Sequence, residues 1–245
     1  MAYVHVFLQN KGGCGKTTLA YFLAQYLLDN GFSVKCIDVD PLNHSLGSYE
    51  RLNATSLSIL DENGQIDPMK FGPMVDIIAG SDEDDRIIID NGSGSFMSFC
   101  SAMSEAMIFD MLTEMGHTVY IHSPFISGNN LGFTAAAFIQ MADTYFPSST
   151  FIAWINPYFG RVSHEGKSLS ESNLFKNYQN RIAAVIDLPA LLKDSLSGKS
   201  INMMTDDCLT FEEAIDGQRY SLYVQQILQT AKRKIYSAIT SCPLL

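Results

Sequence analysis

Short apolar runs alternate with amphipathic segments along the whole chain, and this pattern predicts the fold. Near-continuous runs such as Ile87-Ile88-Ile89 are typical of strands that are buried on both faces of a parallel sheet. The predicted strands are residues 3–9, 34–39, 86–90, 118–124, 150–156 and 182–187. The predicted helices are residues 16–30, 44–52, 97–115, 129–145, 169–179, 190–197, 210–216 and 219–240. Strands that alternate with helices indicate an α/β fold, a doubly wound and mainly parallel sheet with helices on both faces.

Two stretches stand out against this regular alternation. We expect residues 1–245 to form a single domain. The least regular part, residues 61–85, is rich in turn residues and ends in an acidic run, so it is predicted to be a surface insertion. The last helix, residues 219–240, carries an apolar stripe that we expect to pack on the sheet. Its basic cluster Lys232-Arg233-Lys234 leaves contact with a membrane surface as the alternative.

Composition narrows the class of protein. A hydrophobic fraction of 47% with 17% charged residues excludes a disordered chain. No apolar run approaches the roughly 20 residues that span a bilayer, and no signal peptide is visible. Five cysteines without metal-ligand spacing favour reduced thiols in a cytoplasmic protein, and the five histidines show no ligand spacing either. The formal net charge of −10 argues against direct binding to DNA, whose backbone repels an acidic chain.

The most informative motif is Lys-Gly-Gly-Cys-Gly-Lys-Thr-Thr at residues 11–18, between a predicted strand and a predicted helix. In this context, glycines let successive backbone N–H groups turn toward a phosphate, and the helix N-terminus adds positive charge. Lys16 can reach the β- and γ-phosphates of a nucleotide, and the Thr17 hydroxyl can bind Mg²⁺. The predicted nucleotide contacts in this loop are Gly12, Gly13, Cys14, Gly15, Lys16, Thr17 and Thr18.

The motif departs from the usual phosphate loop at its start. Asn10 stands where the first glycine is expected, and a second lysine, Lys11, precedes Gly12. In this the chain resembles the MinD/ParA class of P-loop ATPases. The resemblance implies ATP or ADP and Mg²⁺ as ligands and an ATP-dependent homodimer. It also implies that Lys11 crosses the dimer interface to the partner's nucleotide, where its charge acts as an arginine finger does.

Three aspartates lie at the carboxyl ends of predicted strands and complete this site. Asp38 and Asp40 alternate at the end of the second strand, so they share a face where a Mg²⁺–phosphate site is expected. By resemblance, Asp40 orients the attacking water, while Asp38 supports the loop lysine and the metal shell. Asp90 ends an apolar run in a Walker B pattern and would hold Mg²⁺ through a water. The resemblance thus assigns catalytic roles to Lys11, Lys16 and Asp40, and metal contacts, mostly through water, to Thr17, Asp38, Asp40 and Asp90.

Two further positions resemble the base-contacting residues of the family. Asn156 ends the fifth predicted strand, and its amide offers a donor and an acceptor to an adenine edge. The alternative for Asn156-Pro157 is an ordinary turn. Pro189 follows the last strand and resembles a second base contact. Two positions depart from the family: Gly92-Ser93-Gly94-Ser95 follows Asp90 where prolines are common, and Cys14 stands where valine is common. A helix N-terminus could lower the thiol pKa of Cys14, although a tolerated small residue is the favoured interpretation.

Several stretches outside the nucleotide motifs resemble the TraL proteins of conjugative plasmids. They are residues 36–43, 90–96, 154–160, 164–168 and 209–211. This resemblance implies a slow, partner-stimulated cytoplasmic ATPase in conjugative DNA transfer, linked to a type IV secretion system. Partners could recruit it to the inner face of the membrane. The alternatives are a nucleotide-sensing module with negligible hydrolysis, a plasmid partition or positioning ATPase, and a small-molecule amidating enzyme on the same scaffold.

Overall fold

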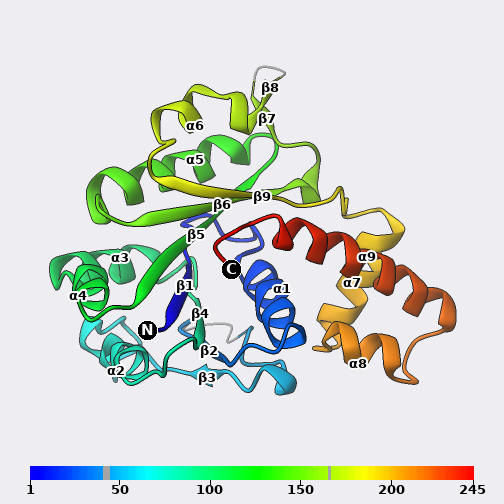
Figure 1. Cartoon of the computed structure of the whole chain (residues 1–245), viewed down its shortest axis with the longest axis horizontal. Helices are drawn as coiled ribbons and strands as arrows, with labels where there is room; N and C mark the ends of the chain where they lie inside the picture. The colour runs from blue at the N-terminus through cyan, green and yellow to red at the C-terminus, as the bar shows by residue number, and fades with distance from the viewer. Residues whose placement is uncertain (41–44, 165–166) are drawn as a thin grey trace.

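A parallel sheet runs through the molecule in the strand order β3-β2-β4-β1-β5-β6-β9 (Figure 1). The computed structural model describes residues 1–40, 45–164 and 167–245. The strands of the sheet are β1 Tyr3–Phe7, β2 Val34–Asp38, β3 Thr55–Ser56, β4 Arg86–Asp90, β5 Thr118–Ile126, β6 Thr150–Asn156 and β9 Ile182–Asp187. The six predicted strands are confirmed, and so is the doubly wound α/β fold; the short edge strand β3 was not predicted. A separate hairpin pairs β7 Ser163–His164 with β8 Lys167–Ser168.

Helices cover both faces of this sheet. The α-helices are α1 Lys16–Asp29, α2 Gly72–Ala79, α3 Phe96–Glu105, α4 Ile108–Glu114, α5 Asn130–Gln140, α6 Asn173–Asn177, α7 Leu196–Asp206, α8 Phe211–Asp216 and α9 Leu222–Thr240. Shorter turns of helix are η1 Glu50–Leu52, η2 Pro68–Phe71, η3 Met141–Tyr145, η4 Pro157–Phe159 and η5 Leu169–Glu171. The helices predicted at 16–30, 129–145, 210–216 and 219–240 are confirmed to within three residues at each end, the second of them with η3 as its last turn.

Alternate residues along the strands are buried in two separate hydrophobic cores. Val4 and Val6 of β1 belong to one core, whereas Phe7 belongs to the other, as the pleat of a strand requires. The first core takes in residues of α2 to α6, and the second takes in residues of α1, α7, α8 and α9. Figure 1 has α2, α3 and α4 on the left of the view and α1, α7, α8 and α9 on the right. Strands that are buried on both faces explain the continuous apolar runs of the sequence.

Four predicted helices differ from the observed ones. The helix predicted at 169–179 is the short turn η5 followed by α6, because Ser172 between them has an extended backbone. The helix predicted at 97–115 is two helices, because Met107 has a left-handed backbone with φ 48° between α3 and α4. In the region predicted as a helix at 44–52, the described residues contain only η1, and residues 45–48 form turns. The prediction at 190–197 was wrong, because the chain stays irregular until Ser195 caps α7 by accepting a hydrogen bond from Gly198 N.

Residues 61–85 are not simply a surface insertion. They contain α2, whose Met74 and Ile78 are fully buried in the first core together with Phe71. Pro73 lies in the first turn of this helix, a position that proline tolerates, so the Gly-Pro pair starts a helix here instead of a loop. The acidic run is tied to the sheet at its end: Asp85 is buried and forms a 2.6 Å ion pair with Lys35.

A chain of three aromatic side chains crosses the second core. Trp154 Nε1 donates to His122 Nδ1 at 2.8 Å, so the other nitrogen of His122 carries a proton toward His5 Nδ1, 3.0 Å away. Because His5 Nδ1 accepts this proton, its own proton is on Nε2. That Nε2–H is buried and has no hydrogen-bond partner among the described residues. Burial, aided by the Arg86 charge, lowers the pKa of His5 to about 3. Burial also lowers the pKa of His122 well below its usual value.

This buried pair predicts a loss of stability in mild acid. Because both folded-state pKa values lie below the usual 6.5, the unfolded chain binds more protons below that pH. The contribution of these neutral histidines to the free energy of unfolding is complete above pH 6.5 and is lost as the pH falls toward 3. His5→Phe removes one of the two groups, so wild type should lose about 2 kcal/mol relative to this variant between pH 7 and pH 5. Urea unfolding at pH 7 and pH 5 measures the free energy of unfolding of both proteins. If the difference between wild type and His5→Phe is the same at both pH values, the prediction is contradicted.

Candidate functional site

The phosphate loop is fixed in place where it leaves the sheet. Gln9 is fully buried, and its amide donates to the carbonyl oxygens of Pro124 at 3.2 Å and Thr134 at 3.1 Å. Its side-chain oxygen accepts from Asn10 N at 3.0 Å. Gln9 therefore joins the start of the loop to β5 and α5. Gln9 was not predicted as a site residue, although a polar residue at the end of an apolar run was the available signal.

The loop itself has a backbone that only glycine adopts readily. Gly13 has φ 70° and Gly15 has φ 93°, both in the left-handed region. Gly15 is the N-cap of α1, so no side chain of the N-cap residue caps this helix. Its first turn contains no acidic residue. The N-terminus of α1 is therefore left open to an anion. Lys16 is buried at this end of the helix, with 7% of its surface exposed.

Asp38 and Asp40 leave β2 together but make different contacts. Asp38 is fully buried, and its two oxygens accept from Asp40 N at 3.0 Å and Gly47 N at 2.9 Å. It therefore shapes the loop after β2. Asp40, in the loop after β2, is half-buried, and its side chain packs against the loop after β4. A Cβ built on Gly92 of that loop would stand 2.6 Å from Asp40 Cγ. The next residue, Ser93, approaches the phosphate loop, since a Cβ on Gly12 would stand 3.3 Å from its Oγ.

Asp90 ends β4 beneath the phosphate loop, 1% exposed. Burial raises the pKa of its carboxyl group to about 7, and the charges of Asp38 and Asp40 add to the shift. A hydrogen bond with Thr17 and the charge of Lys16 oppose it. Its Oδ1 has no hydrogen-bond partner among the described residues. An unpaired buried carboxylate oxygen next to a threonine hydroxyl fits a water of a Mg²⁺ shell.

The described residues offer no ready-made metal cage. Among them, no three His, Cys, Asp or Glu side chains are grouped so that they could hold a metal ion by themselves. The contacts predicted for Thr17, Asp38, Asp40 and Asp90 therefore need phosphate oxygens and waters to complete a metal shell, as Mg²⁺ in nucleotide sites generally does. The four-residue metal shell stays a prediction.

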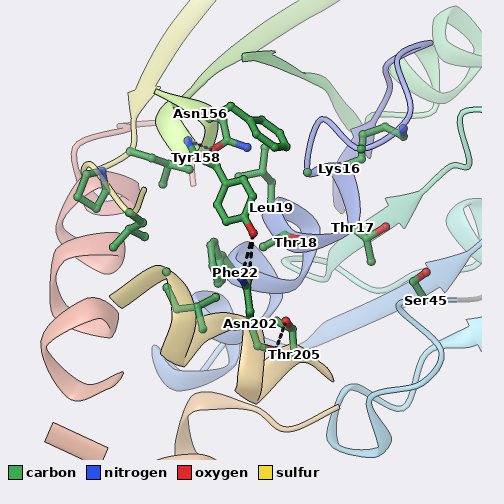
Figure 2. Close-up of a pocket in the computed structure, with 18 of the residues that line it drawn as sticks. Lys16, Thr17, Thr18, Leu19, Phe22, Ser45, Asn156, Tyr158, Asn202 and Thr205 are labelled. Carbon is green, nitrogen blue, oxygen red and sulfur yellow. Dashed lines mark hydrogen bonds between the residues drawn. The ribbon is translucent and has the colours of Figure 1, made fainter. Parts of the chain in front are cut away.

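A cavity of about 360 Å³ extends from the phosphate loop toward α7 (Figure 2). Of the predicted site residues it brings together Gly13, Gly15, Lys16, Thr17, Thr18, Asp40, Asn156 and Pro189. Its lining, as far as the structure describes it, does not include Lys11, Gly12, Cys14, Asp38 or Asp90. Lys11 lies half-buried in the loop after β1, outside the cavity.

Asn156 holds the phosphate loop against the end of β6. Its Nδ2 donates to the carbonyl of Cys14 at 3.0 Å, and its Oδ1 accepts from Tyr158 N at 3.2 Å. The contact is close, because a Cβ on Gly15 would stand 2.7 Å from Asn156 Nδ2. Asn156 also caps η4, so the turn expected as the alternative is present. The amide thus has protein partners on both atoms, and base contacts by Asn156 and Pro189 stay predictions.

Several cavity residues at the end away from the phosphate loop were not predicted as ligand contacts. They include Phe22 of α1 and Asn202 and Thr205 of α7. Tyr158, from the loop after β6, lines the same end. No sequence signal pointed to Asn202, since α7 was expected to end before it.

Cys14 does not have the environment of a reactive thiol. It is 1% exposed, and burial raises the pKa of its thiol, with the Lys16 charge only partly opposing the shift. The interpretation as a small buried residue is therefore favoured over the one with a lowered pKa.

The C-terminal helix packs on the protein. The apolar residues Leu228, Ala231, Ile235 and Ile239 of α9 are all buried in the second core. Lys232 from the basic cluster forms a 2.7 Å ion pair with Asp29 of α1. In the part of the chain that the structure describes, no helix combines the length and the apolar character needed to cross a bilayer.

The fold and the glycine loop together define a P-loop nucleotide-binding protein. Residues 6–239 match the family described as CobQ/CobB/MinD/ParA nucleotide binding domain, and the chain belongs to this family, whose MinD/ParA members are P-loop ATPases. Along its whole length the chain is similar to two Escherichia coli proteins described as Protein TraL. Each is 32% identical over 245 residues, which cover 100% of both chains. The resemblances to the MinD/ParA class and to TraL proteins are thus confirmed.

Solved structures agree with this fold. The MinD cell division protein of Aquifex aeolicus superimposes with a TM-score of 0.50 and 21% identity, covering 94% of this chain and 96% of that one. A plasmid partition protein of Borrelia burgdorferi B31, bound to AMPPNP, gives a TM-score of 0.51 and 14% identity, with 98% and 99% covered. At these identities the likeness concerns the fold alone.

Proposed function

We propose that this protein is a Mg²⁺-dependent ATPase switch that dimerises when it binds ATP and separates after slow hydrolysis. The observation that carries the proposal is the contact of Asp40 with Gly92, which joins the loops after β2 and β4 beside the phosphate loop. Ser93 extends this contact to Gly12. Two loops that meet at the phosphate site can both respond to a γ-phosphate, which is how nucleotide switches work.

Each residue of the site has a role in this proposal. The N–H groups of the phosphate loop and Lys16 bind the phosphates, while Thr17 and Asp90 hold Mg²⁺, with Asp38 and Asp40 reaching its waters. Mg²⁺ would neutralise charge on the β- and γ-phosphates. Asp40 orients the attacking water. Lys11 stands outside the cavity of its own chain, which supports a role at the partner's nucleotide.

We place this switch in the transfer of conjugative plasmids, linked to a type IV secretion system. The full-length similarity to TraL proteins supports that role. Its partners would be components of that machinery in the cytoplasm, which could bring it to the inner face of the membrane. The net charge of −10 argues against direct DNA binding, and the buried stripe of α9 argues against direct membrane binding.

The proposal predicts that Lys16→Ala weakens Mg-ATP binding about 100-fold or more. The variant removes a buried ammonium group that makes charge-assisted contacts with phosphate. Isothermal titration calorimetry measures the affinity. Lys176→Ala, on the exposed face of α6, is the matched control and should bind as wild type does. Equal affinity for Lys16→Ala and the control would refute a phosphate site at this loop.

A second variant tests the contact between the two loops. Gly92→Ala should push Asp40 aside, because the new Cβ would come within 2.6 Å of its Cγ. We expect ATP hydrolysis to fall about 10-fold or more while ATP affinity stays within about 3-fold, since a misplaced catalytic group affects the transition state most. Gly132→Ala, where a Cβ meets nothing within 4 Å, is the control. Steady-state phosphate release measures both, and unchanged hydrolysis in Gly92→Ala would count against Asp40.

A further inference from the structure

The loop after β4 is held by buried polar side chains at its two ends. It runs from Asn91 to Ser95 and connects β4 to α3. Asn91 and Ser95 are both 0% exposed, although their side chains are polar. Because buried polar groups in proteins are almost always hydrogen-bonded, the partners of these two side chains show which contacts order the loop.

Ser95 stands where a helix cap is expected, yet its side chain does not cap the helix. It is the N-cap residue of α3, a position where serine usually accepts a hydrogen bond from the first turn. Within the described residues, Ser95 makes no such bond. Its hydroxyl instead points back to the loop and is shared between Asn91 Oδ1 at 2.9 Å and the Gly92 carbonyl oxygen at 3.1 Å. The hydroxyl therefore stabilises the loop instead of the helix.

The Gly92 carbonyl is bound by both of these side chains. Asn91 Nδ2 donates to it at 3.0 Å, in addition to the Ser95 hydroxyl. We name this group of hydrogen bonds the Asn91–Ser95 clasp. Gly92 also packs against Asp40, since a Cβ on Gly92 would stand 2.7 and 2.9 Å from the two carboxylate oxygens. Gly92 therefore joins the clasp to the Asp40 carboxylate.

The sequence of this loop makes its shape dependent on the clasp. The loop contains Gly92 and Gly94 and no proline, so its backbone has many accessible conformations. Ser93, between the two glycines, lines the cavity and approaches Gly12 of the phosphate loop. A shift of Gly92 would therefore disturb contacts with both Asp40 and the phosphate loop. A misplacement of about 1 Å can lower an enzymatic rate about 100-fold.

We propose that Ser95 and Asn91 are positioning residues for ATP hydrolysis that act through Asp40. The clasp holds Gly92 in place, and Gly92 in turn sets the position of the Asp40 carboxylate. This inference rests on the proposed function, in which Asp40 orients the attacking water. It also gives a role to Gly92-Ser93-Gly94-Ser95, a segment in which the sequence departs from the family.

Ser95→Ala tests the clasp with a small change of volume. It should lower kcat for ATP hydrolysis about 10-fold, while the KM for ATP and the affinity for Mg-ADP stay within about 3-fold of wild type. A misplaced catalytic group affects the transition state more than binding. Asn91→Ala, which removes the other side chain of the clasp, should act in the same way. Ser101→Ala, an exposed serine of α3, is the matched control and should hydrolyse ATP as wild type does. Phosphate release and calorimetry measure these quantities.

A double variant separates positioning from a general structural role. If Ser95 acts through Asp40, Ser95→Ala should change single-turnover hydrolysis by less than about 2-fold in an Asp40→Ala background, because both changes remove the same contribution. An equal loss of about 10-fold in both backgrounds would overturn the inference. Wild-type hydrolysis by Ser95→Ala would also overturn it, as would a loss of Mg-ADP affinity beyond about 3-fold in that variant.

The proposed function fails by different results. A wild type that does not hydrolyse Mg-ATP, or an Asp40→Ala variant that hydrolyses it at the wild-type rate, would refute the proposed function and the inference with it. The results named for Ser95→Ala overturn the inference alone.

Discussion

Lys11→Ala should lower ATP hydrolysis by about 10³-fold and leave the protein monomeric in Mg-ATP. The expected size is that of an arginine finger supplied by a partner, because a lysine acting in trans would place the same charge on the transferring phosphoryl group. ATP affinity of the monomer should stay close to wild type, since Lys11 does not line the cavity of its own chain. Single-turnover hydrolysis and calorimetry measure the two quantities.

Mixing two inactive variants tests the trans arrangement directly. In a mixed dimer of Lys11→Ala and Asp40→Ala chains, the site on the Lys11→Ala chain has its own Asp40 and receives Lys11 from the other chain. Hydrolysis should therefore reappear on mixing, at up to about half the wild-type rate per dimer, because one of two sites is complete. If Lys11 acts within its own chain, both sites of the mixed dimer lack one group and the mixture stays inactive.

Asp40→Ala should lower hydrolysis about 10²- to 10³-fold while it preserves ATP binding. In the proposed mechanism this carboxylate orients the attacking water, and a group that acts mainly in the transition state contributes about this much. Because the γ-phosphate then persists, the ATP-bound dimer should accumulate. Asp67→Ala is the control. It removes the carboxylate that caps η2, in another loop, and should hydrolyse ATP at the wild-type rate. Rapid hydrolysis by Asp40→Ala would remove Asp40 from the mechanism.

The sequence predicted the phosphate end of the cavity because local rules decide it. The glycines at 13 and 15 adopt the left-handed backbone that their positions in the motif require, and Lys16 follows them at the start of α1. Asp38 was expected near the metal, and its spacing did indicate a shared edge with Asp40. Its two oxygens nevertheless bind backbone N–H groups of the following loop, a local preference of aspartate that also explains its position.

The end of the cavity at α7 could not be predicted, because distant contacts decide where α7 begins. Ala190-Leu191-Leu192 has the composition of a helix, yet the chain there crosses over the first turn of α7, at a distance that only Gly198 permits. A single sequence gives no sign of that crossing. The same holds for residues 61–85, where turn residues hid a helix that is recognised by the burial of Met74 and Ile78. His5 and His122 lie far apart in sequence and meet only through the pairing of β1 with β5.

In the proposed switch, ATP controls the association of two chains. Size-exclusion chromatography with light scattering on Asp40→Ala, in Mg²⁺ with either ATP or ADP, tests it most directly. We predict a mass of twice the 27.1 kDa chain with ATP and a single chain with ADP. The double variant Lys11→Ala,Asp40→Ala should remain a single chain in both. A single chain of Asp40→Ala with ATP as well as with ADP would contradict the switch.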